Sequence, residues 1–180
     1  MFAVVKEIHG AGNAVNETTV SRKYEKLTCS LIERDISITT MESCTSGQVA
    51  SLITDTEGSS AILKGAFITY SNEAKIRQGV RAEIIDTYGV YSAETATAMA
   101  EACRAAYGAD LGIGITGSFG NTDPNNADSI PGEAYFAIAT VQGTESFHCS
   151  IPVQSSRRAY KFYIADVIGD CLLSRISGAS

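Results

Sequence analysis

Segments with a helical spacing of apolar residues alternate with short β-branched or apolar segments along most of this chain. Two of the short segments are almost continuously apolar, as in strands that are covered on both faces. The sequence therefore predicts a three-layer α/β/α domain with a mixed β-sheet. We predict strands over residues 36–41, 66–71, 111–116, 133–141 and 145–153, and helices over residues 22–34, 47–55, 72–80, 93–108 and 155–176.

The 180 residues are enough for one domain with a sizeable core. Residues 1–21 mix Gly, Asn and Thr without a period, so we predict a loose N-terminal leader there and a single domain over residues 22–180. Within that domain, Ser92 is the predicted N-cap of the helix over residues 93–108, and Gly108 is the predicted residue just after its end.

Charge and composition exclude several classes of function. The net charge is −6, from 14 basic and 20 acidic residues, and this argues against nucleic acid or an anionic membrane as a partner. The chain has no apolar stretch long enough to span a membrane and no secretory signal, so we expect a cytoplasmic protein. Five widely spaced cysteines and two histidines provide no pattern of metal ligands, so we expect neither a metal nor another cofactor.

Three loops should meet where the strands of such a sheet end, at residues 42–47, 70–75 and 116–132. The first loop places Ser43, Cys44, Thr45 and Ser46 before a helix, where unpaired N–H groups stabilise an oxyanion or a phosphate. The alternative is that these hydroxyls only cap the helix. Cys44 is either a nucleophile or a small buried side chain, and the lack of a nearby histidine favours the second.

The second loop brings Tyr70, Asn72 and Lys75 together just after a strand. A lysine can accept a proton from a serine hydroxyl if burial lowers its pKa. The alternative is a solvated Lys75 and a half-buried Tyr70.

The third loop starts with ITGSFG, whose glycines permit close approach of a ligand but do not form a phosphate-loop motif. Arg157, Arg158 and Lys161 form the densest basic cluster of the chain. The cluster suits either one phosphate group or a charged surface.

Four strings occur in a characteristic order: ESCTSG at 42–47, GSSAILKGAFITYSNEAK at 58–75, GVYSAETATAMAEACR at 89–104 and ITGSFG at 115–120. With them the chain resembles the C-terminal domain of the competence and damage-inducible CinA proteins over about residues 22–176. Stand-alone members of that family are nicotinamide mononucleotide deamidases. The resemblance implies an amidohydrolase that converts nicotinamide mononucleotide and water into nicotinic acid mononucleotide and ammonia.

The resemblance also implies roles for particular residues. Ser43 matches the nucleophile, Lys75 the catalytic lysine and Tyr70 an assisting tyrosine. An arginine that starts the last helix matches Arg157 or Arg158. We assign substrate binding to Cys44, Thr45, Ser46, Gly47, Asn72, Thr116, Gly117, Arg157 and Arg158.

Family members tend to associate. We therefore expect a homo-oligomer, specifically a dimer, through the edge of the hairpin at residues 133–152 or through the last helix.

Two positions depart from the family pattern. Ser46 stands where the family usually has glycine, and residues 117–132 replace a glycine-rich loop. These departures leave two alternatives open: a nucleotide-binding or regulatory module without activity, or an amidase that acts on another small amide.

Overall fold

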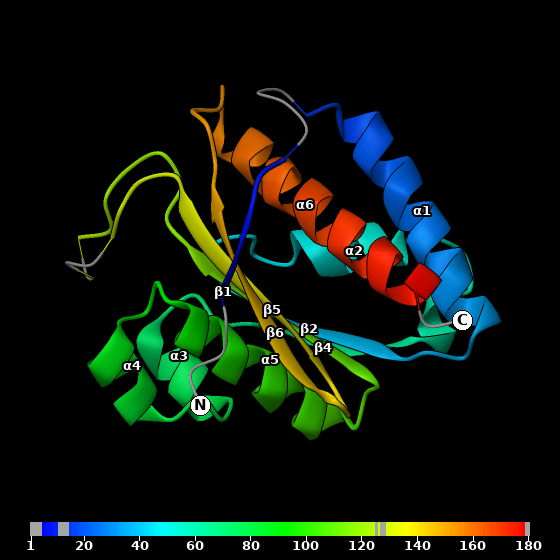
Figure 1. The fold of residues 1–180 in the computed structure, drawn as a ribbon, viewed down its shortest axis with the longest axis horizontal. Coiled ribbons are helices and arrows are strands. Elements are labelled where there is room, and N and C mark those ends of the chain that lie inside the picture. The colour runs from blue at the N-terminus through cyan, green and yellow to red at the C-terminus, as the bar shows by residue number, and fades with distance from the viewer. Residues whose placement is uncertain (1–4, 11–14, 125, 127–128, 179–180) are drawn as a thin grey trace.

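A six-stranded mixed sheet in the order β1-β6-β5-β4-β2-β3 forms the centre of the molecule (Figure 1). The structure is a computed structural model that describes residues 5–10, 15–124, 126 and 129–178. Strands β1, β2 and β3 run parallel to their neighbours, whereas β4, β5 and β6 are joined by antiparallel pairing. The strands are β1 (Val5–Ile8), β2 (Ile38–Glu42), β3 (Leu63–Ile68), β4 (Leu111–Gly117), β5 (Glu133–Thr140) and β6 (Gly143–Ser150).

Helices cover both faces of this sheet (Figure 1). On one face lie α1, α2 and α6, and on the other lie α3, α4 and α5. This arrangement confirms the predicted three-layer α/β/α fold with a mixed sheet. The helices are α1 (Glu17–Glu33), α2 (Gln48–Thr54), α3 (Asn72–Arg77), α4 (Ala82–Tyr88), α5 (Ala93–Tyr107) and α6 (Arg157–Gly178), and a short 3-10 turn is η1 (Ser59–Ala61).

Helix α5 packs directly on β4 because β4 carries glycines. A Cβ atom at Gly114 would lie 2.1 Å from the carbonyl oxygen of Ala96 and 2.4 Å from the backbone nitrogen of Ala100. The ends of α5 are those that the sequence predicts. The Ser92 hydroxyl accepts a hydrogen bond from the N–H of Thr95 (3.1 Å), and Gly108 has a φ of +59°. Both predicted caps are confirmed.

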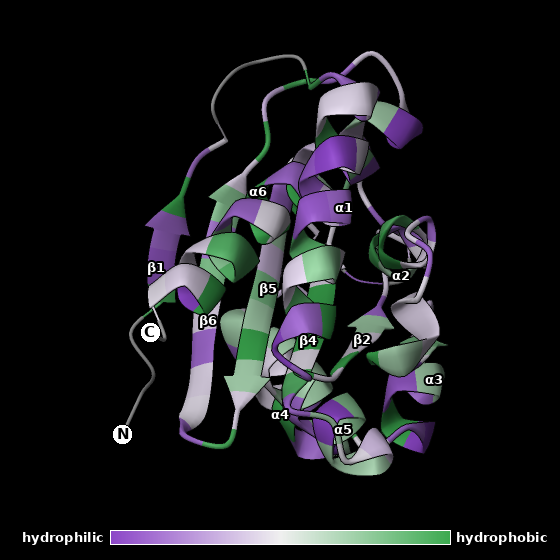
Figure 2. Cartoon of the chain, turned by 90° about the vertical axis from the view of Figure 1, so that its right-hand side faces the viewer, coloured by the Kyte–Doolittle hydropathy of each residue, from purple (hydrophilic) through white to green (hydrophobic). Residues whose placement is uncertain are grey.

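The largest difference from the sequence prediction lies in the N-terminal segment. Val5–Ile8 forms β1, which pairs with β6, and α1 begins at Glu17 with Asn16 as its N-cap. These residues are therefore not a loose leader; residues 1–4 and 11–14 lie outside the described residues. Figure 2 shows that β1 is mostly hydrophilic. Strands are predicted from sequence by their pattern of apolar residues, and β1 lacks such a pattern.

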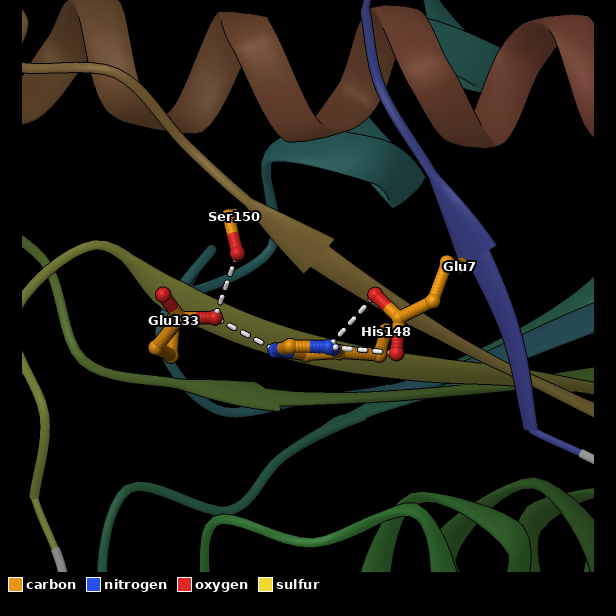
Figure 3. A network of polar contacts seen from close by, with 4 residues as sticks. All are labelled: Glu7, Glu133, His148 and Ser150. Atoms are coloured by element: carbon orange, nitrogen blue, oxygen red, sulfur yellow. Dashed lines mark hydrogen bonds and ion pairs between the residues drawn. The ribbon is translucent and has the colours of Figure 1, made fainter.

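A polar network holds β1 to the sheet (Figure 3). The Nδ1 atom of His148 lies 2.8 Å from a carboxylate oxygen of Glu7, and its Nε2 atom contacts Glu133. Ser150 donates a hydrogen bond to the same Glu133 carboxylate (2.9 Å). Because β1 covers the outer side of β6, the edge of the hairpin that the sequence offers as a docking face is already paired.

Candidate active site

A pocket of about 270 Å³ opens where β2 and β4 end. These strands and β3 are parallel, so the segments that follow them meet at one edge of the sheet. Larger hollows of about 440 and 470 Å³ lie elsewhere, but among the described residues that line them no hydroxyl is bonded to a buried lysine. The pocket is lined by Ser43, Cys44, Tyr70, Tyr91, Gly117, Ser118, Phe119, Asn121, Asp123, Pro124 and Arg157.

Ser43 and Lys75 form the central contact of this site. The Nζ atom of Lys75 lies 3.1 Å from the Oγ atom of Ser43 and also donates to the carbonyl oxygen of Thr69 (2.9 Å). Ser43 follows β2 and donates its backbone N–H to the carbonyl oxygen of Ile115 in β4 (3.0 Å). Lys75 lies on α3, whose N-cap is Ser71. The solvated Lys75 of the alternative reading is excluded, because its exposed fraction is 1%.

Burial changes the chemistry of Lys75. Removing the ammonium group from water lowers its pKa from 10.5 to about 8, although the charge of Asp123 acts in the opposite direction. About a tenth of the amine is then neutral at pH 7. This amine can accept the proton of the neighbouring Ser43 hydroxyl.

Glu42 is a buried residue of the site that the sequence analysis missed. Its carboxylate accepts hydrogen bonds from the N–H groups of Gly47 (2.9 Å), Val49 (3.2 Å) and Ala50 (2.9 Å) at the start of α2. The Thr40 hydroxyl donates to it as well (3.1 Å). Its place at the end of a β-branched strand and just before a helix is the signal that could have revealed it. The helix N–H groups that the sequence offers to an oxyanion are thus largely occupied.

The turn from Ser43 to α2 carries two backbone N–H groups, those of Cys44 and Thr45, whose hydrogen bonds go to the Cys44 sulfur. Among the described residues, no oxygen accepts a hydrogen bond from the N–H groups of Cys44 or Thr45. The Oγ1 atom of Thr45 is also buried without a partner in that part of the chain.

Ser46 and Gly47 both have positive φ angles, +51° and +88°. Their role in the structure is to shape this turn, since neither lines the pocket.

Cys44 lines the pocket beside Ser43. Burial raises the pKa of its thiol to about 12, with a further contribution from the charge of Glu42. Because only the thiolate is an effective nucleophile, this environment favours Ser43 over Cys44 as the attacking group.

Tyr70 and Arg157 lie together at the mouth of the pocket. The Tyr70 hydroxyl is 3.2 Å from an Arg157 nitrogen, and 61% of the tyrosine is exposed. No hydrogen bond among the described residues joins Tyr70 to Ser43 or Lys75. Arg158 does not line the pocket and forms an ion pair with Glu17 of α1 (2.7 Å).

Of the remaining predicted residues, Gly117 lines the pocket, whereas Thr116 and Asn72 lie outside its lining. Gly117 lines the pocket with its backbone. Thr116 is fully buried, and its hydroxyl donates to the carbonyl oxygen of Val90 (2.8 Å). This hydrogen bond ties the end of β4 to the segment that precedes α5. Asn72 donates to the side chain of Asn126 in the third loop (3.0 Å).

Tyr91 and Asp123 line the pocket as well and were missed in the sequence. Their side chains are joined by a hydrogen bond of 2.6 Å between the Tyr91 hydroxyl and the Asp123 carboxylate. Asp123 lies in the loop that departs from the family pattern, where no motif predicts a role.

Within the described ranges, no group of three or more His, Cys, Asp or Glu side chains is placed to hold a metal ion. No helix in the same ranges has the length and hydropathy needed to cross a membrane.

Sequence comparisons identify relatives of the chain. A model of the CinA C-terminal domain matches residues 20–165. The chain is 40% identical over 130 residues to the Escherichia coli K12 protein named nicotinamide-nucleotide amidohydrolase PncC, a match that covers 72% of this chain and 78% of that protein. It is 34% identical over 148 residues to a CinA-like protein of Shewanella pealeana, covering 80% of this chain and 34% of the relative. It spans 28% of a relative from Desulforudis audaxviator, so several curated relatives are much longer.

Solved structures resemble the fold. A CinA superfamily protein from Klebsiella pneumoniae has a TM-score of 0.81 at 22% identity, over 88% of this chain and 98% of that one. A competence/damage inducible protein from Agrobacterium tumefaciens has a TM-score of 0.79 at 22% identity, over 91% of this chain and 98% of that one. At this identity the likeness concerns the fold alone.

Proposed function

This chain belongs to the CinA C-terminal domain family, and we propose that it is an amidohydrolase that releases ammonia from a nicotinamide nucleotide. The observation that carries the proposal is the contact of 3.1 Å between the Ser43 hydroxyl and the buried amine of Lys75. The name of the Escherichia coli relative supports the choice of substrate.

In the proposed first step, the Ser43 oxygen attacks the carboxamide carbon while its proton passes to the neutral amine of Lys75. Lys75 then gives this proton to the nitrogen of the tetrahedral intermediate. The C–N bond breaks, ammonia leaves, and the acyl group remains on Ser43 as an ester. The lowered pKa of Lys75 suits a group that must both accept and donate a proton near neutral pH.

In the second step, water attacks the ester carbon and Lys75 accepts a proton from that water. The bond to Ser43 breaks, the serine oxygen recovers a proton from Lys75, and the product leaves as a carboxylic acid that gives its remaining proton to the solvent. The N–H groups of Cys44 and Thr45 follow the nucleophile directly and are the proposed donors to the oxyanion in both steps. The N–H groups at the start of α2 are not proposed as donors to the oxyanion, because they already donate to the Glu42 carboxylate.

Arg157 is the proposed partner of the substrate phosphate, because it lines the pocket and carries a guanidinium that suits bidentate contact with phosphate. Arg158 is not proposed for this role, because Glu17 already pairs with it. Tyr70 is proposed to orient Arg157 through their hydrogen bond.

Ammonia release from nicotinamide mononucleotide tests the proposal. Ser43→Ala should lower kcat by at least about a thousandfold, as the loss of a nucleophile does in related mechanisms. Ser51→Ala is a matched control, since it removes an exposed hydroxyl from α2 and should leave the rate unchanged. The double variant with Lys75→Ala should be little slower than either single variant, since the two groups act as one unit.

Three results would contradict the proposal in distinct ways. Substantial turnover by Ser43→Ala together with its loss in Cys44→Ala would make the thiol the nucleophile. Binding of the nucleotide without turnover by the wild type would indicate a non-catalytic module. Equal turnover of amides that lack the phosphate would indicate an amidase for another small amide.

A further inference from the structure

The pocket contains two opposite charges that do not pair with each other. Arg157 and Asp123 both line it. No ion pair joins them in the described part of the chain. Opposite charges in one small pocket would attract each other unless separate contacts held each of them in place.

Neutral groups hold the cationic pole. The Nη1 atom of Arg157 donates to the carbonyl oxygen of Phe119 (3.3 Å) and to the side-chain oxygen of Asn121 (3.1 Å). The Nη2 atom donates to the Tyr70 hydroxyl (3.2 Å). None of these partners is a carboxylate, so the guanidinium is oriented without being neutralised.

Two neutral side chains donate to the carboxylate that forms the anionic pole. The Tyr91 hydroxyl and the side-chain nitrogen of Asn126 each donate to the Asp123 carboxylate, both at 2.6 Å. The backbone N–H of Asp123 donates to the Ser129 hydroxyl (2.8 Å). The negative charge of Asp123 also acts on Lys75 of the reacting pair, where it opposes the effect of burial on the pKa of the amine.

We propose that Asp123 and Arg157 select a zwitterionic ligand, with Arg157 on its phosphate and Asp123 facing its cationic pyridinium ring. The inference rests on the proposed function and specifies the charge state of its substrate. A nicotinamide ring bonded to ribose through its ring nitrogen carries a positive charge in its oxidised form. The reduced dihydropyridine ring is neutral.

The aromatic lining supports the same assignment. Tyr91, whose hydroxyl donates to Asp123, lines the same pocket. The faces of aromatic rings attract cations. The site should therefore bind the oxidised mononucleotide more tightly than the reduced one, although the two have nearly the same shape.

Calorimetric titration can measure this preference without turnover if Ser43→Ala is the background variant. The probes are oxidised and reduced nicotinamide mononucleotide. Adding Asp123→Asn should weaken binding of the oxidised form by about tenfold and of the reduced form by less than about twofold, since charge pairing contributes to only one of them. Asp123→Glu keeps the charge and should retain most of the preference. Glu57→Gln is the control, because it removes an exposed charge outside the pocket.

Equal weakening of both nucleotides by Asp123→Asn would overturn the inference, as would an unchanged ratio between them. If Asp123→Asn unfolds the protein, the ratio in Asp123→Glu decides the question by the same criterion. Failure of the proposed function is distinguishable: the wild type would then release no ammonia, whereas the binding ratio would still report on the charge pairing.

Discussion

At Lys75, burial and charge act in opposite directions on one ammonium group. Burial lowers its pKa, and the negative charge of Asp123 acts in the opposite direction. The balance is a pKa of about 8, close to the pH at which a general base is most effective. Sequence similarity can suggest a catalytic lysine, but the lowered pKa depends on side chains from several segments.

The pH dependence of the rate follows from this value. If Lys75 must be neutral to accept the Ser43 proton, kcat/KM should rise by about tenfold per pH unit below pH 8 and level off above it. Lys75→Arg should be inactive throughout, because a guanidinium stays protonated. Initial rates of ammonia release from pH 5.5 to 9.5 would measure the profile. A rate that falls as pH rises through 8 would exclude Lys75 as the base.

Glu42 acts on the position of the nucleophile rather than on the substrate. Its carboxylate is fully buried and binds the first turn of α2, so it holds both ends of the turn that carries Ser43. Buried carboxylates are favourable only when such donors surround them.

Replacing Glu42 should therefore affect stability. Glu42→Ala leaves several backbone N–H groups without an acceptor and should lower the free energy of unfolding by about 3 kcal/mol. Urea denaturation would measure the loss. Glu57→Ala, at an exposed position, should change stability by less than about 0.5 kcal/mol. A loss of similar size in both variants would contradict the role of Glu42 as a cap.

At the scale of the elements, the packing of α5 on β4 places the end of β4 at the pocket. The glycines of β4 and the alanines of α5 let the two backbones approach closely. Local patterns predict both elements well, and α5 has both of its predicted caps. They do not predict α4 (Ala82–Tyr88), a two-turn helix that carries one buried residue, Ile85.

Gly114→Ala tests the close approach of α5 and β4. Its Cβ atom would overlap backbone atoms of Ala96 and Ala100, so the variant should lose about 2 kcal/mol or more, as overpacked cores do. Gly178→Ala is the control, because a Cβ atom there meets nothing within 4 Å. Thermal and urea unfolding of the two variants would measure the difference. An unchanged stability in Gly114→Ala would show that the contact is looser than described.

At the scale of the whole molecule, β1 joins the N-terminal segment to the hairpin of β5 and β6. Its network contains Glu7 from β1, His148 from β6 and Glu133 from the start of β5 (Figure 3). Burial alone would lower the pKa of His148, but its hydrogen bonds to Glu7 and Glu133 outweigh that effect and raise the pKa above 6.5.

Stability should depend on pH through this histidine. A raised pKa in the folded state stabilises the protein below pH 6.5, and this contribution is lost as pH rises through the folded-state pKa. The wild type should exceed His148→Gln by up to about 1 kcal/mol at pH 5.5 and by less at pH 9. Urea denaturation at both pH values would measure this. His9→Gln, at an exposed position, should follow the wild type; a constant difference for His148→Gln would contradict the expectation.

The dimer expected from the sequence stays a prediction. The hairpin edge is paired with β1, so β1 is the open edge of the sheet on that side, and one face of α6 packs against α1. Light scattering at micromolar concentration should give about twice the chain mass of 19.0 kDa. A mass near that of a single chain would contradict the prediction.

Local patterns in the sequence determined most of the helices and strands, the layered α/β class and the caps of α5, because each depends on residues close together in the chain. The resemblance carried by ESCTSG and TYSNEAK pointed to Ser43 and Lys75 before any contact was visible. The tertiary structure alone decided the partner of β1, the capping role of Glu42, the distinct positions of Arg157 and Arg158, and the place of Asp123 in the same pocket as Ser43. Each of these depends on contacts or burial created when separate segments pack together, and no local period encodes them.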